Sequence, residues 1–92
     1  MTDLRKYARG QACKIRIPNV CNHNPETTVL AHIRLQGISG MGMKAPDLLG
    51  AWACSACHAY VDSHSDVETM EAFYEGVFRT QNQLIKDDVI EW

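Results

Sequence analysis

The first third of the 92-residue chain alternates apolar and polar positions over short segments. Leu4 to Ala8 is short and basic and predicts a helical turn that Gly10 stops. Ala12 to Ile17 alternates apolar and basic residues, which is typical of a strand. Thr27 to Ile33 is rich in β-branched residues and predicts a second strand. We therefore expect a small β unit preceded by a short helix.

The middle of the chain predicts a return strand and a second helix. Gln36 to Asp47 contains three glycines and indicates a loop. Leu48 to Ala53 is apolar and short, as expected of a strand that pairs with the one before the loop. Ser55 to Asp62 then predicts a short helix that begins between two cysteines.

The last part of the chain has the spacing of one amphipathic helix over residues 66–86. Ser65 is expected as its N-cap, with Glu68 at the third helical position, as in a capping box. Behind this start, one stripe recurs every three or four residues and is expected to pack in the core: Met70, Phe73, Tyr74, Val77, Phe78, Gln81, Leu84 and Ile85. The predicted fold class is α+β, with a helix closing over a small β unit.

Composition adds three constraints. With 46% hydrophobic and 22% charged residues, the chain is an ordinary globular domain, and at 10.3 kDa its core needs extra support from a metal, disulfides or a partner. We expect no membrane span and no secretory signal, and therefore a cytoplasmic protein. Residues 1–44 hold seven Lys and Arg against two Asp and Glu, whereas residues 45–92 hold two against nine. This asymmetry permits a polyanionic partner on one face, although two ordinary solvated surfaces also explain it.

Four cysteines in a reducing compartment indicate a metal site before they indicate disulfides. Cys54 and Cys57 form a CxxC knuckle, which presents two thiolates on one tight turn. Cys13 and Cys21 have a looser spacing and would complete a tetrahedral, structural Zn²⁺ site that clamps the N-terminal segment. The alternative is four reduced thiols packed as small hydrophobic side chains.

The segment from Cys54 to His58 also matches the CxxCH motif of c-type haem attachment. Three observations disfavour haem: the absence of an export signal, the two cysteines left without a role, and too little apolar helix in residues 1–53 to enclose the group. We expect no haem.

The histidines offer acid–base and metal chemistry. His32 lies in an apolar strand and is either a core residue or a general base. His58 and Asp62 lie four residues apart on one helix face, so they form a surface pair or share a divalent cation. His23 and His64 have no partner that the sequence identifies and are expected at the surface. A hairpin with a histidine, packed on a helix with metal ligands, suits phosphodiester hydrolysis.

In their order along the chain, these motifs resemble the HNH, or His-Me finger, nucleases, and within them the small phage and prophage proteins of the YbcO type. The resemblance covers roughly residues 3–62 and is carried by Cys13 to Cys21, Asn24-Pro25-Glu26-Thr27, Leu30-Ala31-His32-Ile33-Arg34, Pro46-Asp47-Leu48 and Ala53-Cys54-Ser55-Ala56-Cys57-His58. It implies a single domain over residues 1–92, whose core, residues 12–63, is a ββα-metal unit. It also implies a protein encoded by a phage or prophage in a bacterial host.

The resemblance further implies a role for each matching residue. His32 would be the general base of a DNA endonuclease, and the four cysteines would be the structural zinc ligands. His58, assisted by Asp62, would hold a catalytic Mg²⁺ or Mn²⁺. Asp47 falls near the central asparagine, which holds the base or loop in place.

Two positions depart from the family pattern. Ala31 precedes His32 where many HNH sequences have a metal ligand, and Asp47 stands in place of asparagine. A centre without the first ligand holds its cation weakly, recruits it only with DNA, or is a poor catalyst. Arg34 and Lys44 are candidate phosphate contacts, as are five other basic residues: Arg5, Lys6, Arg9, Lys14 and Arg16.

Two functions therefore remain open at this stage. One is a metal-dependent DNA endonuclease that uses His32 as its base. The other is a non-catalytic, zinc-stabilised module that binds nucleic acid or protein.

Overall fold

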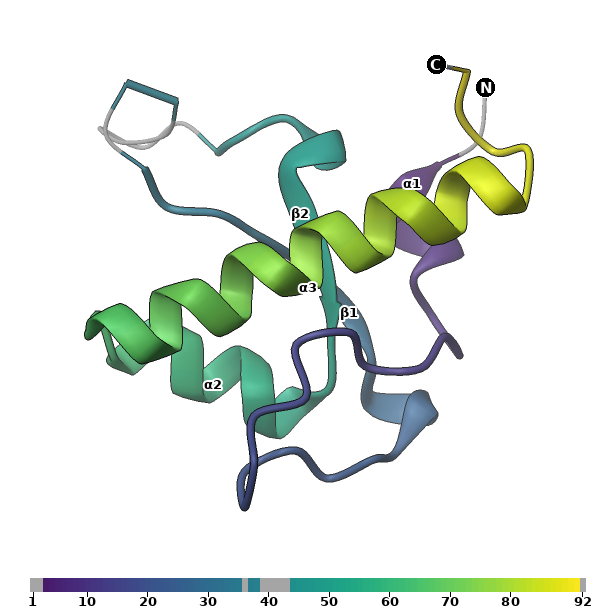
Figure 1. The fold of residues 1–92 in the computed structure, drawn as a ribbon. Helices are drawn as coiled ribbons and strands as arrows, with labels where there is room; N and C mark the ends of the chain where they lie inside the picture. The colour runs from purple at the N-terminus through teal and green to yellow at the C-terminus, as the bar shows by residue number, and fades with distance from the viewer. Residues whose placement is uncertain (1–2, 36, 39–43, 92) are drawn as a thin grey trace.

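The computed structural model describes residues 3–35, 37–38 and 44–91 and has an α+β fold (Figure 1). Its two strands, β1 (Val29–His32) and β2 (Gly50–Ala53), form one antiparallel sheet. Three α-helices and two short 3₁₀ turns accompany them: α1 (Leu4–Tyr7), α2 (Ser55–Ser63), α3 (Val67–Lys86), η1 (Pro25–Thr27) and η2 (Asp47–Leu49). The predicted helices and the two later strands are thus confirmed as elements.

The hairpin holds the centre of the molecule. Val29 pairs with Ala53 and His32 with Gly50, and the amide of Ile33 still donates to the carbonyl of Leu49, at 3.0 Å. All four residues of β2 are buried, which explains why its sequence is continuously apolar rather than alternating. A Cβ on Gly50 would lie 2.8 Å from Leu30 Cδ1, so a larger residue at this end of β2 would need the Leu30 side chain to move.

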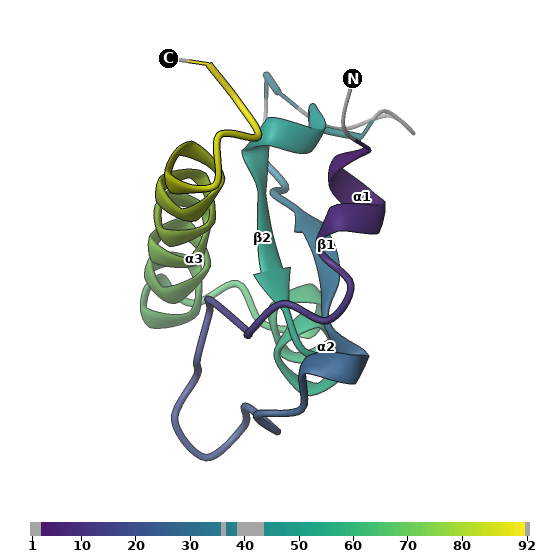
Figure 2. The same ribbon diagram turned by 90° about the vertical axis from the view of Figure 1, so that its right-hand side faces the viewer.

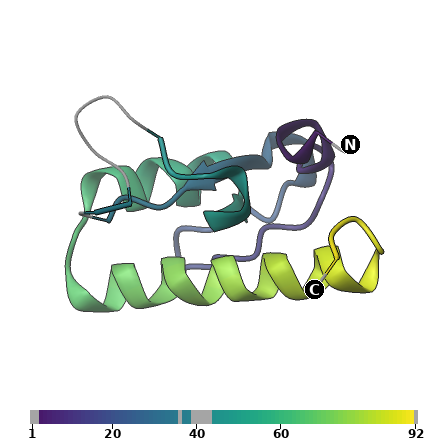
Figure 3. The ribbon, with the colours of Figure 1, turned by 90° about the horizontal axis from the view of Figure 1, so that it is seen from above.

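Helix α3 lies along one face of the hairpin, and α1 lies on the other side (Figures 2 and 3). Phe73 and Val77 of α3 pack with Ala51 and Ala53 of β2 in the larger hydrophobic core. Gly76 allows this close approach, because a Cβ there would lie 2.8 Å from Ile15 Cγ1 and 3.2 Å from Ala51 Cβ. Helix α3 therefore packs at once on the sheet and on the N-terminal segment.

A second, smaller core joins α1 to the end of α3. It is formed by Ala8, Trp52 and Leu84, and Trp52 is the largest fully buried side chain. The Tyr7 ring lies 6.0 Å from the Trp52 ring, and its hydroxyl donates to Asp87 at 2.7 Å. The backbone N–H of Trp52 donates to the Thr80 hydroxyl at 3.0 Å, so a side chain of α3 also holds β2.

The predicted strand over Ala12 to Ile17 is wrong. The segment makes one backbone hydrogen bond to the hairpin, from the Lys14 amide to the Trp52 carbonyl at 2.7 Å. The Lys14 carbonyl accepts from Arg79 instead of a strand, at 2.9 Å, and Arg16 has a φ of 55°. A left-handed residue turns the chain, so the alternating pattern cannot continue as a ladder.

Two details of α3 also differ from the prediction. Its N-cap is Asp66, not Ser65, because the Asp66 carboxylate accepts both the amide (3.2 Å) and the hydroxyl (2.7 Å) of Thr69. Phe78, expected in the core, is 68% exposed, whereas Phe73, Val77 and Leu84 of the same stripe are buried. The sheet is two strands wide and is too narrow to cover the whole stripe.

Part of the predicted loop, residues 36 and 39–43, lies outside the described residues. Among the helices that the structure describes, none combines the length and apolar character that a membrane crossing requires.

Candidate metal centre and active site

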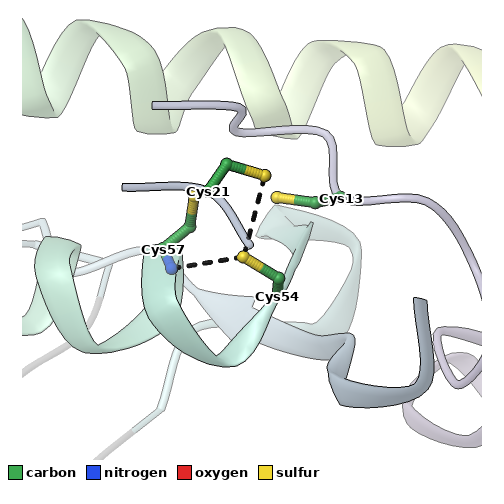
Figure 4. A group of neighbouring side chains, drawn as sticks. All are labelled: Cys13, Cys21, Cys54 and Cys57. Atoms are coloured by element: carbon green, nitrogen blue, oxygen red, sulfur yellow. Dashed lines mark hydrogen bonds between the residues drawn. The ribbon is translucent and has the colours of Figure 1, made fainter. Parts of the chain in front are cut away.

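Two pairs of cysteines from distant parts of the chain meet at the start of α2 (Figure 4). Cys54 is the N-cap of α2 and Cys57 lies in its first turn, while Cys13 and Cys21 come from the segment between α1 and η1. Their four sulfur atoms lie within 4.8 Å of one another. Cys13, Cys54 and Cys57 are buried, and no cysteine is in a disulfide.

This cluster fits a tetrahedral metal ion. Zn–S bonds of about 2.3 Å place tetrahedral sulfurs about 3.8 Å apart. The Sγ atoms of Cys54 and Cys21 are 3.8 Å apart. Four soft donors at this spacing could hold a metal ion such as zinc.

The backbone supports thiolates at this position. The amides of Cys57 and Asn22 donate to the Cys54 sulfur, at 3.4 and 3.5 Å. Burial raises the pKa of Cys54, but these N–H groups, together with hydrogen bonds from the Cys57 and Cys21 thiols, outweigh it and lower the pKa to about 7. Burial raises the pKa of the Cys57 and Cys21 thiols. The group thus combines one thiol with a lowered pKa and two with a raised pKa, and a bound cation would favour the thiolate form of all of them.

Local turns bring Cys21 back to α2. Arg16, Asn19 and His23 all have φ values between 55° and 64°, so the chain reverses repeatedly around Cys21. The side chain of Asn22 donates to Ser55 Oγ at 3.0 Å, which joins this loop to the helix start. Sequence reasoning did not identify Asn22 as a site residue, and only its place in an Asn-rich turn signals it.

His32 lies at the end of β1 with its side chain 13% exposed. Its Nε2 is 2.7 Å from Asp47 Oδ1 on η2, and Arg5 Nε of α1 is 3.4 Å from the same oxygen. The hydrogen bond from His32 holds the pKa of the Asp47 carboxyl below its usual range, and Arg5 acts in the same direction. The structure thus brings together His32 and Asp47, which lie on opposite sides of the loop.

His58 and Asp62 form a second polar group on α2. His58 Nε2 is 3.5 Å from Asp62 Oδ2, and Arg34 Nη2 is 3.2 Å from Asp62 Oδ1. Arg34, expected to contact phosphate, therefore pairs with a carboxylate, whereas Lys44 is exposed. Within the described part of the chain, no hydrogen bond or ion pair joins the rings of His32 and His58.

The two remaining histidines have partners that the sequence did not identify. His23 is exposed, and its Nδ1 lies 3.7 Å from the Cys21 sulfur. His64 is exposed and stacks on Tyr60, with ring centres 3.8 Å apart. Among residues 3–35, 37–38 and 44–91, the four cysteines are the one group of three or more His, Cys, Asp or Glu side chains close enough to share a metal ion.

These features define a class: a small α+β domain with four cysteines close enough to hold a metal ion, and a His–Asp pair formed between the end of β1 and η2. The family model described as "Putative nuclease YbcO" matches residues 2–89, and the chain belongs to this family. Two relatives share 52% identity over 95 aligned residues that cover 99% of each chain. They are "Putative nuclease YbcO" of Escherichia coli K12 and "Putative nuclease ybcO" of Enterobacteria phage 82.

A solved structure has the same fold. It is described as "Structure of a putative bacteriophage protein" from Escherichia coli K-12 and aligns with a TM-score of 0.77 at 47% identity. The alignment covers 94% of this chain and 100% of the solved chain.

Proposed function

We propose that this protein is a metal-dependent DNA endonuclease of HNH type, in which His32 is the general base. The contact between His32 Nε2 and Asp47 Oδ1, at 2.7 Å on a hairpin followed by a helix, carries the proposal. Membership in a family named for nuclease activity supports it. The whole chain acts as one domain, because the N-terminal segment supplies Cys13 and Cys21 and the hairpin supplies His32.

The pairing with Asp47 selects one tautomer of the base. A hydrogen bond from Nε2–H to the carboxylate leaves Nδ1 as the basic nitrogen. Asp47 also keeps the ring in one orientation and stabilises the imidazolium that forms when Nδ1 takes a proton. A water molecule hydrogen-bonded to Nδ1 transfers its proton there, its oxygen bonds to phosphorus, and the bond from phosphorus to the leaving oxygen breaks.

Two kinds of metal ion accompany this chemistry in the proposal. The cysteine cluster holds a structural Zn²⁺, which ties the N-terminal segment to α2. His58 and Asp62 would hold Mg²⁺ or Mn²⁺, with a DNA phosphate and water as further ligands. Such a cation stabilises the negative charge that develops on the phosphate and the leaving oxygen.

Basic residues near this site would bind the substrate. Arg5 contacts Asp47 and Arg34 contacts Asp62, so each guanidinium lies beside one of the two polar groups. An entering phosphate can replace these carboxylates as the partner of Arg5 and Arg34. Lys44 adds an exposed positive charge. Binding is therefore expected to weaken steeply with salt.

The direct test compares wild type with His32→Ala on plasmid and branched DNA in Mg²⁺ or Mn²⁺. General-base catalysis contributes about 10²–10⁴-fold, so His32→Ala is expected to lose at least about a hundredfold in cleavage rate. Glu71→Ala, at an exposed position of α3, is the control for purification and folding. Equal cleavage by wild type and His32→Ala would remove His32 from the mechanism.

Two observations favour a second candidate, a zinc-stabilised module that binds DNA without cutting it. Ala31 offers no ligand, and Arg34 already neutralises Asp62, so the second cation has few donors. DNA binding that persists in His32→Ala, with no strand breaks by wild type in any divalent metal, would select this module instead.

A further inference from the structure

A cavity of about 320 Å³ lies between the end of α2, the start of α3 and the segment after β1. Small-molecule sites begin at about 300 Å³, so this cavity has room for a group such as one nucleobase. The mechanism proposed above uses two of its residues, Arg34 and Asp62, but not the cavity itself.

The lining of the cavity combines apolar side chains with one histidine ring. Val61, Met70 and Phe73 supply the apolar part. His64 supplies a planar ring that stacks on Tyr60, with ring centres 3.8 Å apart and an angle of 9° between the planes. Tyr60 stacks on one face of the His64 ring, so a planar aromatic group can stack only on the other face.

The His64 ring is held in place before any ligand arrives. Its Nδ1 lies 2.9 Å from the carbonyl oxygen of Tyr60 and 3.0 Å from Ser63 Oγ. Since the carbonyl can only accept, Nδ1 carries the proton, and Nε2 is left as an acceptor. A ring fixed in this way loses little conformational freedom when it stacks on a ligand.

The rim of the cavity carries groups that suit a nucleotide. Arg34 offers donors to a phosphate, and the Asp62 carboxylate can accept hydrogen bonds from the amino group of a base. Arg34 also follows His32 by two residues, a step of about 7 Å in extended chain. One edge of the cavity therefore lies two residues along the chain from the proposed general base, just after the end of β1.

We propose that this cavity binds an unpaired nucleobase of a single-stranded DNA segment, stacked on His64. In a duplex the bases are paired and stacked on each other, so they cannot enter without first being extruded. The cavity thus favours single-stranded or branched DNA over intact duplex. That this binding serves cleavage rests on the proposed function, whereas the binding itself does not.

The test measures binding of the full chain to a short single-stranded oligodeoxynucleotide that carries one 2-aminopurine, and to its duplex, without added divalent cation. Stacking of a base on an aromatic side chain is worth about 5- to 150-fold in affinity. His64→Ala is expected to weaken single-strand binding by such a factor and to remove the 2-aminopurine fluorescence change. Duplex binding should stay as it is, and His64→Phe should retain most of the single-strand affinity.

Met70→Trp provides a second variant, since the larger side chain would occupy the cavity while leaving the exposed basic residues in place. Loss of single-strand preference in both His64→Ala and Met70→Trp supports the proposal. Equal affinity of wild type and both variants for the single strand would overturn it, as would an equal loss on duplex and single strand.

These outcomes are separate from those of the nuclease test. Because no divalent cation is added, no cleavage is needed to read the binding. If wild-type protein shows the 2-aminopurine response but cleaves no DNA, the result supports the base-binding site and contradicts only the proposed nuclease function. If wild-type protein cleaves DNA but shows no 2-aminopurine response, the result supports the nuclease function and contradicts only the base-binding site.

Discussion

The cysteine cluster and the histidine sites differ in how their polar groups are satisfied. The four cysteines are mostly buried and face one another and backbone amides. His32 and His58, in contrast, contact carboxylates that are 35–40% exposed and that also pair with Arg5 and Arg34. Buried sulfur ligands that surround one position suit a permanently bound, structural metal ion. Exposed carboxylates that already pair with arginines suit reversible contacts with a substrate.

The largest expected effect comes from breaking the cysteine cluster. Replacing one thiolate in Cys57→Ser should abolish zinc binding and unfold the chain at 25 °C, because structural zinc contributes about 10–16 kcal/mol in small domains. Circular dichroism and elemental analysis of zinc measure this. Ala59→Ser, an exposed position on the same helix, is the matched control. Unchanged melting of Cys57→Ser would contradict a structural role for this site.

Changes near His32 are expected to have the opposite result: a loss of activity without unfolding. Asp47→Ala removes the partner of His32 Nε2, so the ring loses its fixed tautomer and orientation. Misplacement of a catalytic group costs about 10²-fold, and we expect this loss in kcat with little change in KM. Asp47→Asn keeps an oxygen acceptor and should retain more activity. A rise in KM alone would indicate that Asp47 only shapes substrate binding.

A smaller effect is expected at Gly76 of α3, which lies against both the segment that carries Cys13 and the hairpin that carries His32. Gly76→Ala places a Cβ 2.8 Å from Ile15 Cγ1, beside the segment that carries Cys13. Overpacking of this kind costs about 1–3 kcal/mol, so the free energy of unfolding in urea should fall by that amount and zinc affinity should fall with it. Glu71→Ala, exposed on the same helix, should change neither. A melting temperature for Gly76→Ala equal to that of wild type would show that the segment around Ile15 can move away from α3 at no cost in stability.

The smallest expected effect is on the titration of Asp47. Its pKa in the folded protein lies below the usual value because His32 and Arg5 favour the carboxylate. The contribution to stability is therefore fully present above the unfolded pKa of about 3.9 and is lost as the pH falls through the lower, folded pKa.

Carbon-detected NMR titration of Asp47 in wild type and His32→Ala measures this shift. The pKa should rise toward its usual value in His32→Ala. Asp66, whose pKa is lowered by Thr69 on α3, should titrate alike in both proteins. An Asp47 pKa that is the same in both proteins would show that the contact with His32 does not persist in solution.

The element types could be predicted from the sequence where local patterns are strong. The three- and four-residue spacing predicted α3, and the short apolar segment predicted β2. The pattern over Ala12 to Ile17 predicted wrongly, because Arg79 takes the Lys14 carbonyl and Arg16 turns the chain. The first cause is not local to that segment, because Arg79 lies 65 residues away from Lys14. The second, the positive φ of Arg16, lies within the segment but leaves no mark in the alternating pattern.

Residues of the candidate site were identified from their chemistry and from the family resemblance, together with some of their partners, such as Asp62 for His58. The sequence pointed to four cysteines, His32, Asp47, His58 and Asp62 as a set. It did not show that Arg5 reaches Asp47 or that Arg34 pairs with Asp62. The stacked His64 was assigned to the surface without a partner, since ring contacts of this kind carry no motif.

Residue type, spacing and periodicity therefore determined by themselves that this chain has a hairpin, a helix opening on a CxxC knuckle and a long amphipathic helix. Only the tertiary structure decided that the sulfurs of Cys13 and Cys21 lie within 4.8 Å of those of the knuckle, that Arg5 reaches the carboxylate beside His32, and that a cavity opens beside Arg34. The physical reason is range. Helix and strand periods arise between neighbours a few residues apart, whereas these contacts form only when the whole core has packed.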